Sequence, residues 1–72
     1  MREKVILLIE EILELEPGTI TEDTVAEDIA EWDSLGQIMV IGALEEKLGL
    51  NISLEQALQI KSVKDIFTLA DI

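Results

Sequence analysis

A serine between an aspartate and a leucine, in the middle of the chain, is the first candidate for chemistry. Asp33, Ser34 and Leu35 end a polar stretch and begin an apolar segment with helical spacing. Both Asp and Ser favour the first turn of a helix, where a side-chain oxygen accepts a free backbone N–H and a carboxylate meets the positive end of the helix dipole. Two interpretations follow. Ser34 is a helix cap and nothing more, or it stands at the helix start with its hydroxyl in solvent, ready to be modified.

The chain lacks the side chains from which a catalytic centre is usually built. Its 72 residues include no cysteine, histidine or tyrosine. Neither a Ser-His-Asp nor a Cys-His arrangement can therefore form, and the commonest metal ligand is absent. Four carboxylates between the first two predicted helices lack the spacing of a calcium loop; they are Glu22, Asp23, Glu27 and Asp28. We expect neither an enzyme nor a metal site.

Composition limits the domain organisation and the partners. The chain is long enough for one domain, residues 1–72, and 49% of its residues are hydrophobic, which suffices for an aliphatic core. A net charge of −11 disfavours nucleic acid and anionic membrane surfaces; it fits a basic patch on a partner protein and, equally, solubility alone. Glutamates interrupt the first apolar stretch, and no apolar run reaches membrane-spanning length. We expect a monomeric cytoplasmic protein without membrane insertion.

The apolar pattern predicts helices on both sides of the serine. A first helix covers about residues 3–15, with a wide apolar stripe inward and Glu10, Glu11 and Glu14 outside, and it ends before Pro17. A second helix covers Ser34 to Leu48, because Gly49 follows as a left-handed C-cap.

The remaining segments predict a long loop and two further helices. Residues 19–33 are polar but contain a few apolar residues, which indicates an ordered crossing of the bundle with a turn of helix near 26–30. Capping boxes at Ser53 and Ser62 predict a short helix through about Gln59 and a last helix after Ser62. The expected fold is all-α: a four-helix bundle with a long loop between helices 1 and 2 and a short helix 3.

The second helix is expected to present apolar residues both to the core and to solvent. If Ser34 faces solvent, Val40, Leu44 and Leu48 turn inward, Ile41 lies at the boundary, and the neighbours of the serine remain partly exposed; these neighbours are Leu35, Ile38 and Met39. The glycines at positions 36 and 42 each cost about 1 kcal/mol relative to alanine. We interpret them as places where a partner or a cargo approaches the backbone closely.

Asp33-Ser34-Leu35 resembles the phosphopantetheine-attachment motif of the acyl carrier protein family. The likeness extends from the first amphipathic helix to Ser62–Ile66. It implies an acyl-carrier-like bundle, of freestanding type, in which a phosphopantetheinyl transferase moves 4′-phosphopantetheine from coenzyme A to Ser34, flanked by Asp33 as the cap and Leu35 as the adjacent hydrophobic contact. The thiol of the arm would carry acyl groups as thioesters.

The resemblance also implies two surfaces. Partner enzymes with basic patches (acyl-transfer, ligase or synthase enzymes) would dock on exposed residues of the second helix, namely Leu35, Ile38, Met39, Gly42, Glu45 and Glu46. A cargo could fold back between the second and third helices into a groove whose expected lining, alternatively explained by core packing, is Ile38, Ile41, Leu44, Ile52, Leu58 and Ile60.

Departures from the family pattern point to a specialised pathway. Carriers of fatty-acid synthesis usually have acidic residues two and five positions after the serine, where this chain has Gly36 and Met39. Peptidyl carriers usually have paired glycines before the motif, where this chain has Glu31 and Trp32; we interpret Trp32 as an anchor of the loop. An aminoacyl or peptidyl carrier, and an unmodified acidic helical interaction module, remain the alternatives.

Overall fold

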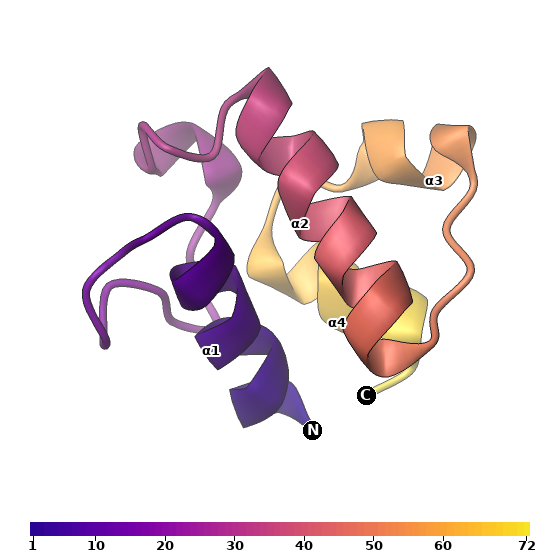
Figure 1. The fold of residues 1–72 in the computed structure, drawn as a ribbon, viewed down its shortest axis with the longest axis horizontal. Coiled ribbons are helices and arrows are strands. Elements are labelled where there is room, and N and C mark those ends of the chain that lie inside the picture. Colours follow the sequence, from indigo (N-terminus) through magenta and orange to yellow (C-terminus); the bar gives the residue numbers. More distant parts are fainter.

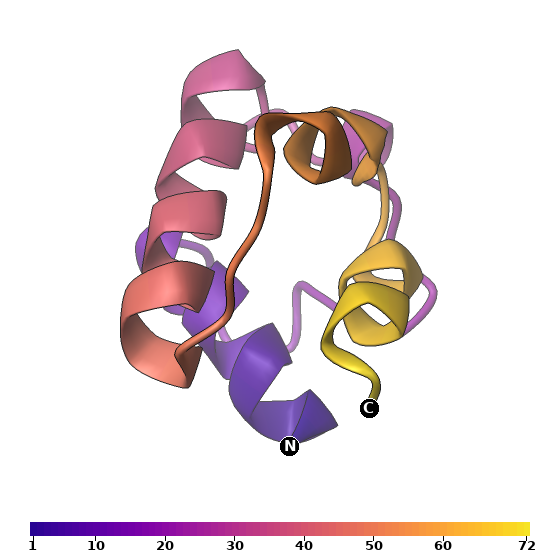
Figure 2. The same cartoon turned by 90° about the vertical axis from the view of Figure 1, so that its right-hand side faces the viewer.

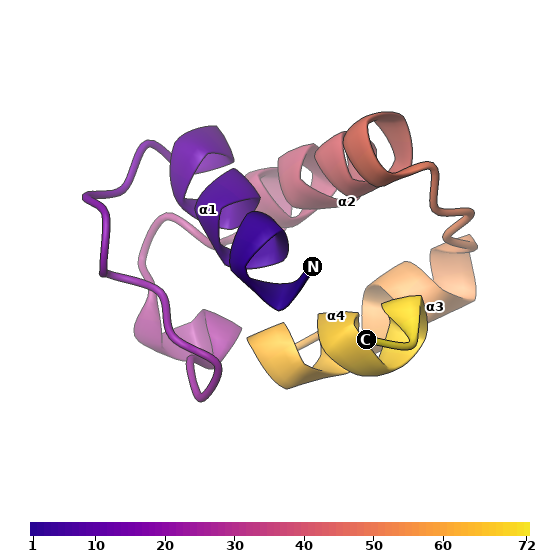
Figure 3. The same cartoon turned by 90° about the horizontal axis from the view of Figure 1, so that it is seen from below.

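Four α-helices and one 3₁₀ turn carry the chain in the computed structural model, which describes all residues from Met1 to Ile72. α1 and α2 form one layer, and η1, α3 and α4 lie below it (Figures 1 and 3). This arrangement confirms the predicted all-α bundle with its long loop and short third helix. None of the helices has the combination of length and hydropathy that a membrane-spanning segment needs. The bounds are α1 Arg2–Ile12, η1 Ala26–Asp28, α2 Ser34–Leu48, α3 Leu54–Gln59 and α4 Val63–Ala70.

The core lies between the two layers and is almost wholly aliphatic. Apolar residues recur three or four positions apart along α1, α2 and α4, so that one stripe of each helix faces inward. Ile20 and Trp32 of the long loop and Ile60, after α3, complete the same cluster. Its members are Val5, Ile9, Leu13, Ile20, Trp32, Val40, Leu44, Ile60, Val63, Ile66 and Phe67.

The first helix ends three residues earlier than predicted. Glu14 adopts a left-handed backbone conformation (φ 56°), and the N–H groups of Glu14 and Leu15 donate to the carbonyls of Glu11 and Glu10. These two bonds make a Schellman motif, which satisfies carbonyls at the end of the helix without a glycine. The prediction placed the end by Pro17, but the chain has already turned before it reaches that residue.

Glu10 is buried, contrary to the prediction that it faces solvent. Only 4% of its surface is exposed. Its carboxylate Oε2 accepts hydrogen bonds from the backbone N–H of Gly18 at 2.8 Å and of Ile20 at 3.0 Å. The charge is thus compensated by two donors of the following loop, as burial of a carboxylate requires. Glu11 and Glu14 are exposed as expected.

The long loop is ordered by backbone pairing with the α3–α4 junction. Ala26 N–H donates to the Lys61 carbonyl at 2.8 Å, and Val63 N–H donates to the Thr24 carbonyl at 3.1 Å. Figure 2 shows the loop running beside the start of α4. The predicted turn of helix near 26–30 is present as η1 and is shorter than expected.

One of the two predicted capping boxes is complete. At α3, Ser53 and Gln56 exchange side-chain to backbone bonds as expected. At α4, the Ser62 hydroxyl accepts from the Asp65 N–H, but the Asp65 carboxylate accepts from the N–H of Lys61 and not of Ser62. Aspartate is one methylene shorter than the glutamate or glutamine that normally completes the box, and here it caps the preceding residue.

Candidate functional site

Asp33, and not Ser34, caps the second helix. Asp33 has an extended backbone, and its Oδ1 accepts a hydrogen bond from the Gly36 N–H at 2.8 Å. Ser34 is the first residue within α2 and is exposed. The interpretation of Ser34 as the cap is therefore wrong, because the neighbouring carboxylate already fills that role.

The position of Ser34 suits a phosphate ester. The N-terminus of a helix carries a partial positive charge. Its first backbone N–H groups have no hydrogen-bond acceptor within the helix. An anionic group on the Ser34 side chain would lie at that end of α2, where anions are stabilised. The residues present thus fit a phosphate-linked prosthetic group.

Gly36 is required by the protein itself and not by a partner. A Cβ at this position would lie 2.2 Å from the Glu31 carbonyl oxygen and 3.1 Å from Leu13 Cδ2. The close approach proposed for Gly36 is therefore an internal contact between α2 and the end of the loop. Gly42 is different, since it is exposed and a Cβ there would meet no atom within 4 Å.

The six residues expected to dock partners share one exposed surface of α2. Leu35 and Ile38 are 66% and 68% exposed, and Met39 is 42% exposed. Gly42, Glu45 and Glu46 continue this surface along the helix and are also exposed. Exposed leucine, isoleucine and methionine side chains gathered beside Ser34 are unusual for a surface that contacts only water.

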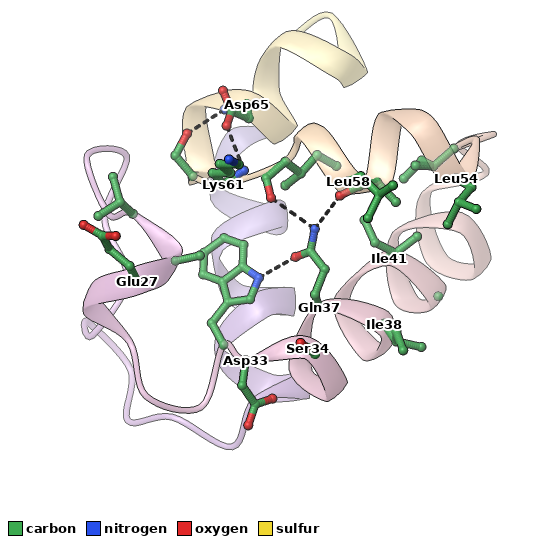
Figure 4. A pocket seen from close by; sticks show the side chains of 18 of the residues that line it. Glu27, Asp33, Ser34, Gln37, Ile38, Ile41, Leu54, Leu58, Lys61 and Asp65 are labelled. Carbon is green, nitrogen blue, oxygen red and sulfur yellow. Dashed lines mark hydrogen bonds between the residues drawn. The ribbon is translucent and has the colours of Figure 1, made fainter.

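A cavity of about 1220 Å³ opens beside Ser34, between α2 and α3. Figure 4 shows Ile38 and Ile41 of α2 opposite Leu54 and Leu58 of α3. Five of the six residues expected to line the cargo groove line this cavity: Ile38, Ile41, Ile52, Leu58 and Ile60. Leu44 does not. It is fully buried in the core, because its position on α2 turns it toward the layer interface.

Sequence reasoning gave no role to Gln37, which connects the elements around the cavity. Its Oε1 accepts from Trp32 Nε1 at 2.6 Å, and its Nε2 donates to the carbonyls of Ala57 at 2.8 Å and Ile60 at 3.2 Å. Trp32 is 5% exposed, in agreement with its predicted role as an anchor. A polar residue one turn after the serine, within an apolar segment, was the available signal, but two of its three partners are backbone carbonyls remote in sequence.

No cluster of three or more His, Cys, Asp and Glu side chains is arranged to hold a metal ion. The four loop carboxylates remain on the surface, and two of them pair with basic residues. Arg2 pairs with Glu22 at 3.1 Å, and Lys64 pairs with Asp23 at 2.9 Å.

Comparison with known proteins gives one match. The family model described as the phosphopantetheine attachment site matches residues 3–69, which is nearly the whole chain. No curated protein and no solved structure matches.

Proposed function

Because this chain belongs to the phosphopantetheine-attachment family of acyl carrier proteins, a family of non-catalytic carriers with a covalently attached 4′-phosphopantetheine arm, we propose that Ser34 is the attachment point. The observation that carries the proposal is the division of roles at the start of α2. Asp33 caps the helix, which leaves the neighbouring, exposed serine free to react.

Attachment needs a transferase and coenzyme A. The Ser34 oxygen attacks the phosphorus that bears the pantetheine, the P–O bond of the pyrophosphate breaks, and adenosine 3′,5′-bisphosphate leaves with the bonding electrons. The serine proton passes to a base of the transferase, since this chain has no histidine to accept it. When bound, the arm supplies the thiol on which carboxylic acids are carried as thioesters.

The cavity beside Ser34 supports an acyl or related carboxylic cargo. Half of its lining residues are hydrophobic, and the side of the cavity between α2 and α3 is formed by isoleucine and leucine side chains. An alkyl group gains free energy by leaving water for such a surface. An aminoacyl cargo would bring a charged amine to the same surface and lose hydration there.

The exposed surface of α2 supports docking of partner enzymes. Leu35, Ile38 and Met39 offer apolar contacts next to the attachment point, and Glu45 and Glu46 offer charges to a basic patch. An acidic residue two positions after the serine, usual in fatty-acid carriers, has no room in this fold because Gly36 is packed against Glu31. This favours dedicated partners in a specialised biosynthetic pathway.

Loading with a broad-specificity phosphopantetheinyl transferase tests the proposal. With coenzyme A and magnesium, the intact mass is expected to rise by one phosphopantetheine. Ser34→Ala is expected to abolish the gain, and Ser53→Ala, which removes the α3 cap, is expected to retain it. Absence of the gain in the folded wild-type chain would remove the proposal and leave an unmodified interaction module.

A further inference from the structure

The Gln37 carboxamide forms a polar bridge within the wall of the cavity. Its oxygen accepts from Trp32 Nε1, and its nitrogen donates to the carbonyls of Ala57 and Ile60. An amide nitrogen has two hydrogens to donate, and both are used here. No buried side-chain nitrogen or oxygen lacks a partner. The bridge is thus fully satisfied, and it joins α2 to the end of the loop and to the end of α3.

This bridge lies between two parts of the cavity that differ in character. In Figure 4, Glu27 and Lys61 lie on one side of the Gln37 amide, and Ile38, Ile41, Leu54 and Leu58 lie on the other. We call the side with Glu27 and Lys61 the polar compartment and the side with the isoleucine and leucine residues the apolar compartment. Asp65, which also lines the cavity, lies on the same side as Lys61 in Figure 4.

We propose that Gln37 is a specificity-determining residue that confines the cargo to the apolar compartment and thereby limits the length of the acyl chain that the carrier shelters. The inference rests on the proposed attachment at Ser34, which also lines the cavity. It follows from the hydrogen bonds of Gln37 and from its place between the two compartments.

The physical reason is the cost of breaking the bridge. An alkyl chain that passed Gln37 would displace the amide and leave the Trp32 indole N–H and two carbonyls without partners, beside buried apolar side chains. Methylene groups cannot replace any of these bonds, so the unpaired groups would oppose entry. A short chain ends before the bridge and leaves it intact.

Trp32 makes the bridge observable. It is the only tryptophan of the chain, it is buried, and its indole N–H is bonded to Gln37. A chain that reaches the bridge must change the surroundings of the indole. Its fluorescence emission and its single indole N–H resonance therefore report on the arrival of cargo.

The experiment loads the chain from acetyl-, butyryl-, hexanoyl- and octanoyl-coenzyme A and follows Trp32 in each product. In the wild type, emission and resonance are expected to stay constant across the series. In Gln37→Met, which keeps the side-chain length and removes the hydrogen bonds, both are expected to shift for the longer chains. Gln59→Met, at an exposed glutamine of α3 outside the cavity, is the matched control and should behave as the wild type.

Two results would overturn the inference: a wild-type response to octanoyl as large as that of Gln37→Met, or a Gln37→Met series as flat as the wild type. Gln37→Leu replaces Gln37→Met if the latter does not fold. If neither folds, the wild-type series decides, since a shift overturns the inference and a constant signal supports it. Intact mass is recorded for every sample, so that failure of loading, which contradicts the proposed function, is separated from failure of the length limit.

Discussion

At the scale of single residues, three neighbours determine how Ser34 is presented. Asp33 takes the cap, Gly36 lets the loop pack against the first turn of α2, and Leu35 projects into solvent beside the serine. Each role follows from a simple property: a carboxylate that accepts an N–H, a missing Cβ, and an apolar side chain without core contacts. The serine can therefore react without loss of a structural contact that it makes itself.

The buried carboxylate of Glu10 gives the clearest residue-scale prediction. We expect Glu10→Ala to lower the free energy of unfolding by about 2–4 kcal/mol, because two backbone N–H groups lose a charged acceptor. Glu10→Gln keeps an acceptor oxygen and should lose less. Denaturant unfolding measures both, and Glu11→Ala, at an exposed position of the same helix, should change stability by no more than about 0.5 kcal/mol. Equal stability of the two alanine variants would contradict the assigned role of Glu10.

Sequence reasoning found residues whose role is local and missed those whose partners are distant. Asp33 was recognised as a capping residue from its immediate neighbours. Glu10 and Gln37 were not recognised, because the backbone atoms that they bind lie 8 to 23 residues away and carry no sequence signal. The prediction placed Glu10 in solvent because carboxylates are rarely buried. That rule does not hold where the protein supplies hydrogen-bond donors to the carboxylate.

At the scale of elements, α2 contains two glycines with opposite roles. We expect Gly42→Ala to raise the free energy of unfolding by about 1 kcal/mol, because it adds helix propensity and meets no atom. Gly36→Ala should lower it by about 1–3 kcal/mol, since the new Cβ would overlap the Glu31 carbonyl. Thermal and denaturant unfolding compare the two variants directly. A stabilised Gly36→Ala would show that the loop does not pack against α2 as described.

Gly42 also tests whether the exposed surface of α2 serves partners. It lines the cavity and lies between Met39 and Glu45 on the proposed docking surface. If a partner or cargo approaches its backbone, Gly42→Ala should slow transfer to the cognate enzyme while it stabilises the fold. Single-turnover transfer measures this, and unchanged kinetics would rule out the close approach.

Helix boundaries were predicted well where a local signal decided them. Asp33 and Gly49 fixed both ends of α2, and Gly49 adopts the left-handed conformation expected of it (φ 68°). α1 ended early because a glutamate took the left-handed position that glycine normally occupies. The bonds of Glu10 to the loop and the packing of Leu15 against the core accompany this early end, and propensity includes neither.

At the scale of the whole molecule, basic residues hold the loop and the termini. Arg2 pairs with Glu22, donates to the Ile72 carbonyl at 3.0 Å and lies 4.9 Å from the centre of the Phe67 ring. Lys64 pairs with Asp23 on the same loop. These two basic residues are thus paired with carboxylates of the loop, whereas Glu45 and Glu46 are exposed on α2.

This charge distribution predicts a salt-dependent encounter with a basic partner. We expect kcat/KM for transferase loading to fall by about tenfold between roughly 0.05 M and 0.5 M salt, as screening shortens the range of the field, while kcat changes little. The double variant Glu45→Gln/Glu46→Gln should reduce both kcat/KM and its salt dependence. Glu3→Gln/Glu11→Gln, which removes the same charge from α1, should reduce them less. Equal effects of the two pairs would contradict docking along α2.

The fold as a whole could be predicted because its helices are strongly periodic and separated by clear breaks. The cavity was anticipated less completely. Leu44 belongs to the core, while Leu54, Trp32 and Gln37 contribute to the lining without having been expected there. Which inward residues line a cavity and which fill the core depends on how far α3 stands from α2. That distance is set by the Gln37 bridge and the chain connections, and no pattern of residues along one helix reports it.

The most direct test of the central claim is to map the modified residue. After loading with coenzyme A and a broad-specificity transferase, fragmentation of the chain should find a single phosphopantetheine, on Ser34. The two other serines, Ser53 and Ser62, accept backbone N–H groups at the starts of α3 and α4 and should remain unmodified. A phosphopantetheine on either of them, or none on Ser34 of the folded protein, would contradict the account.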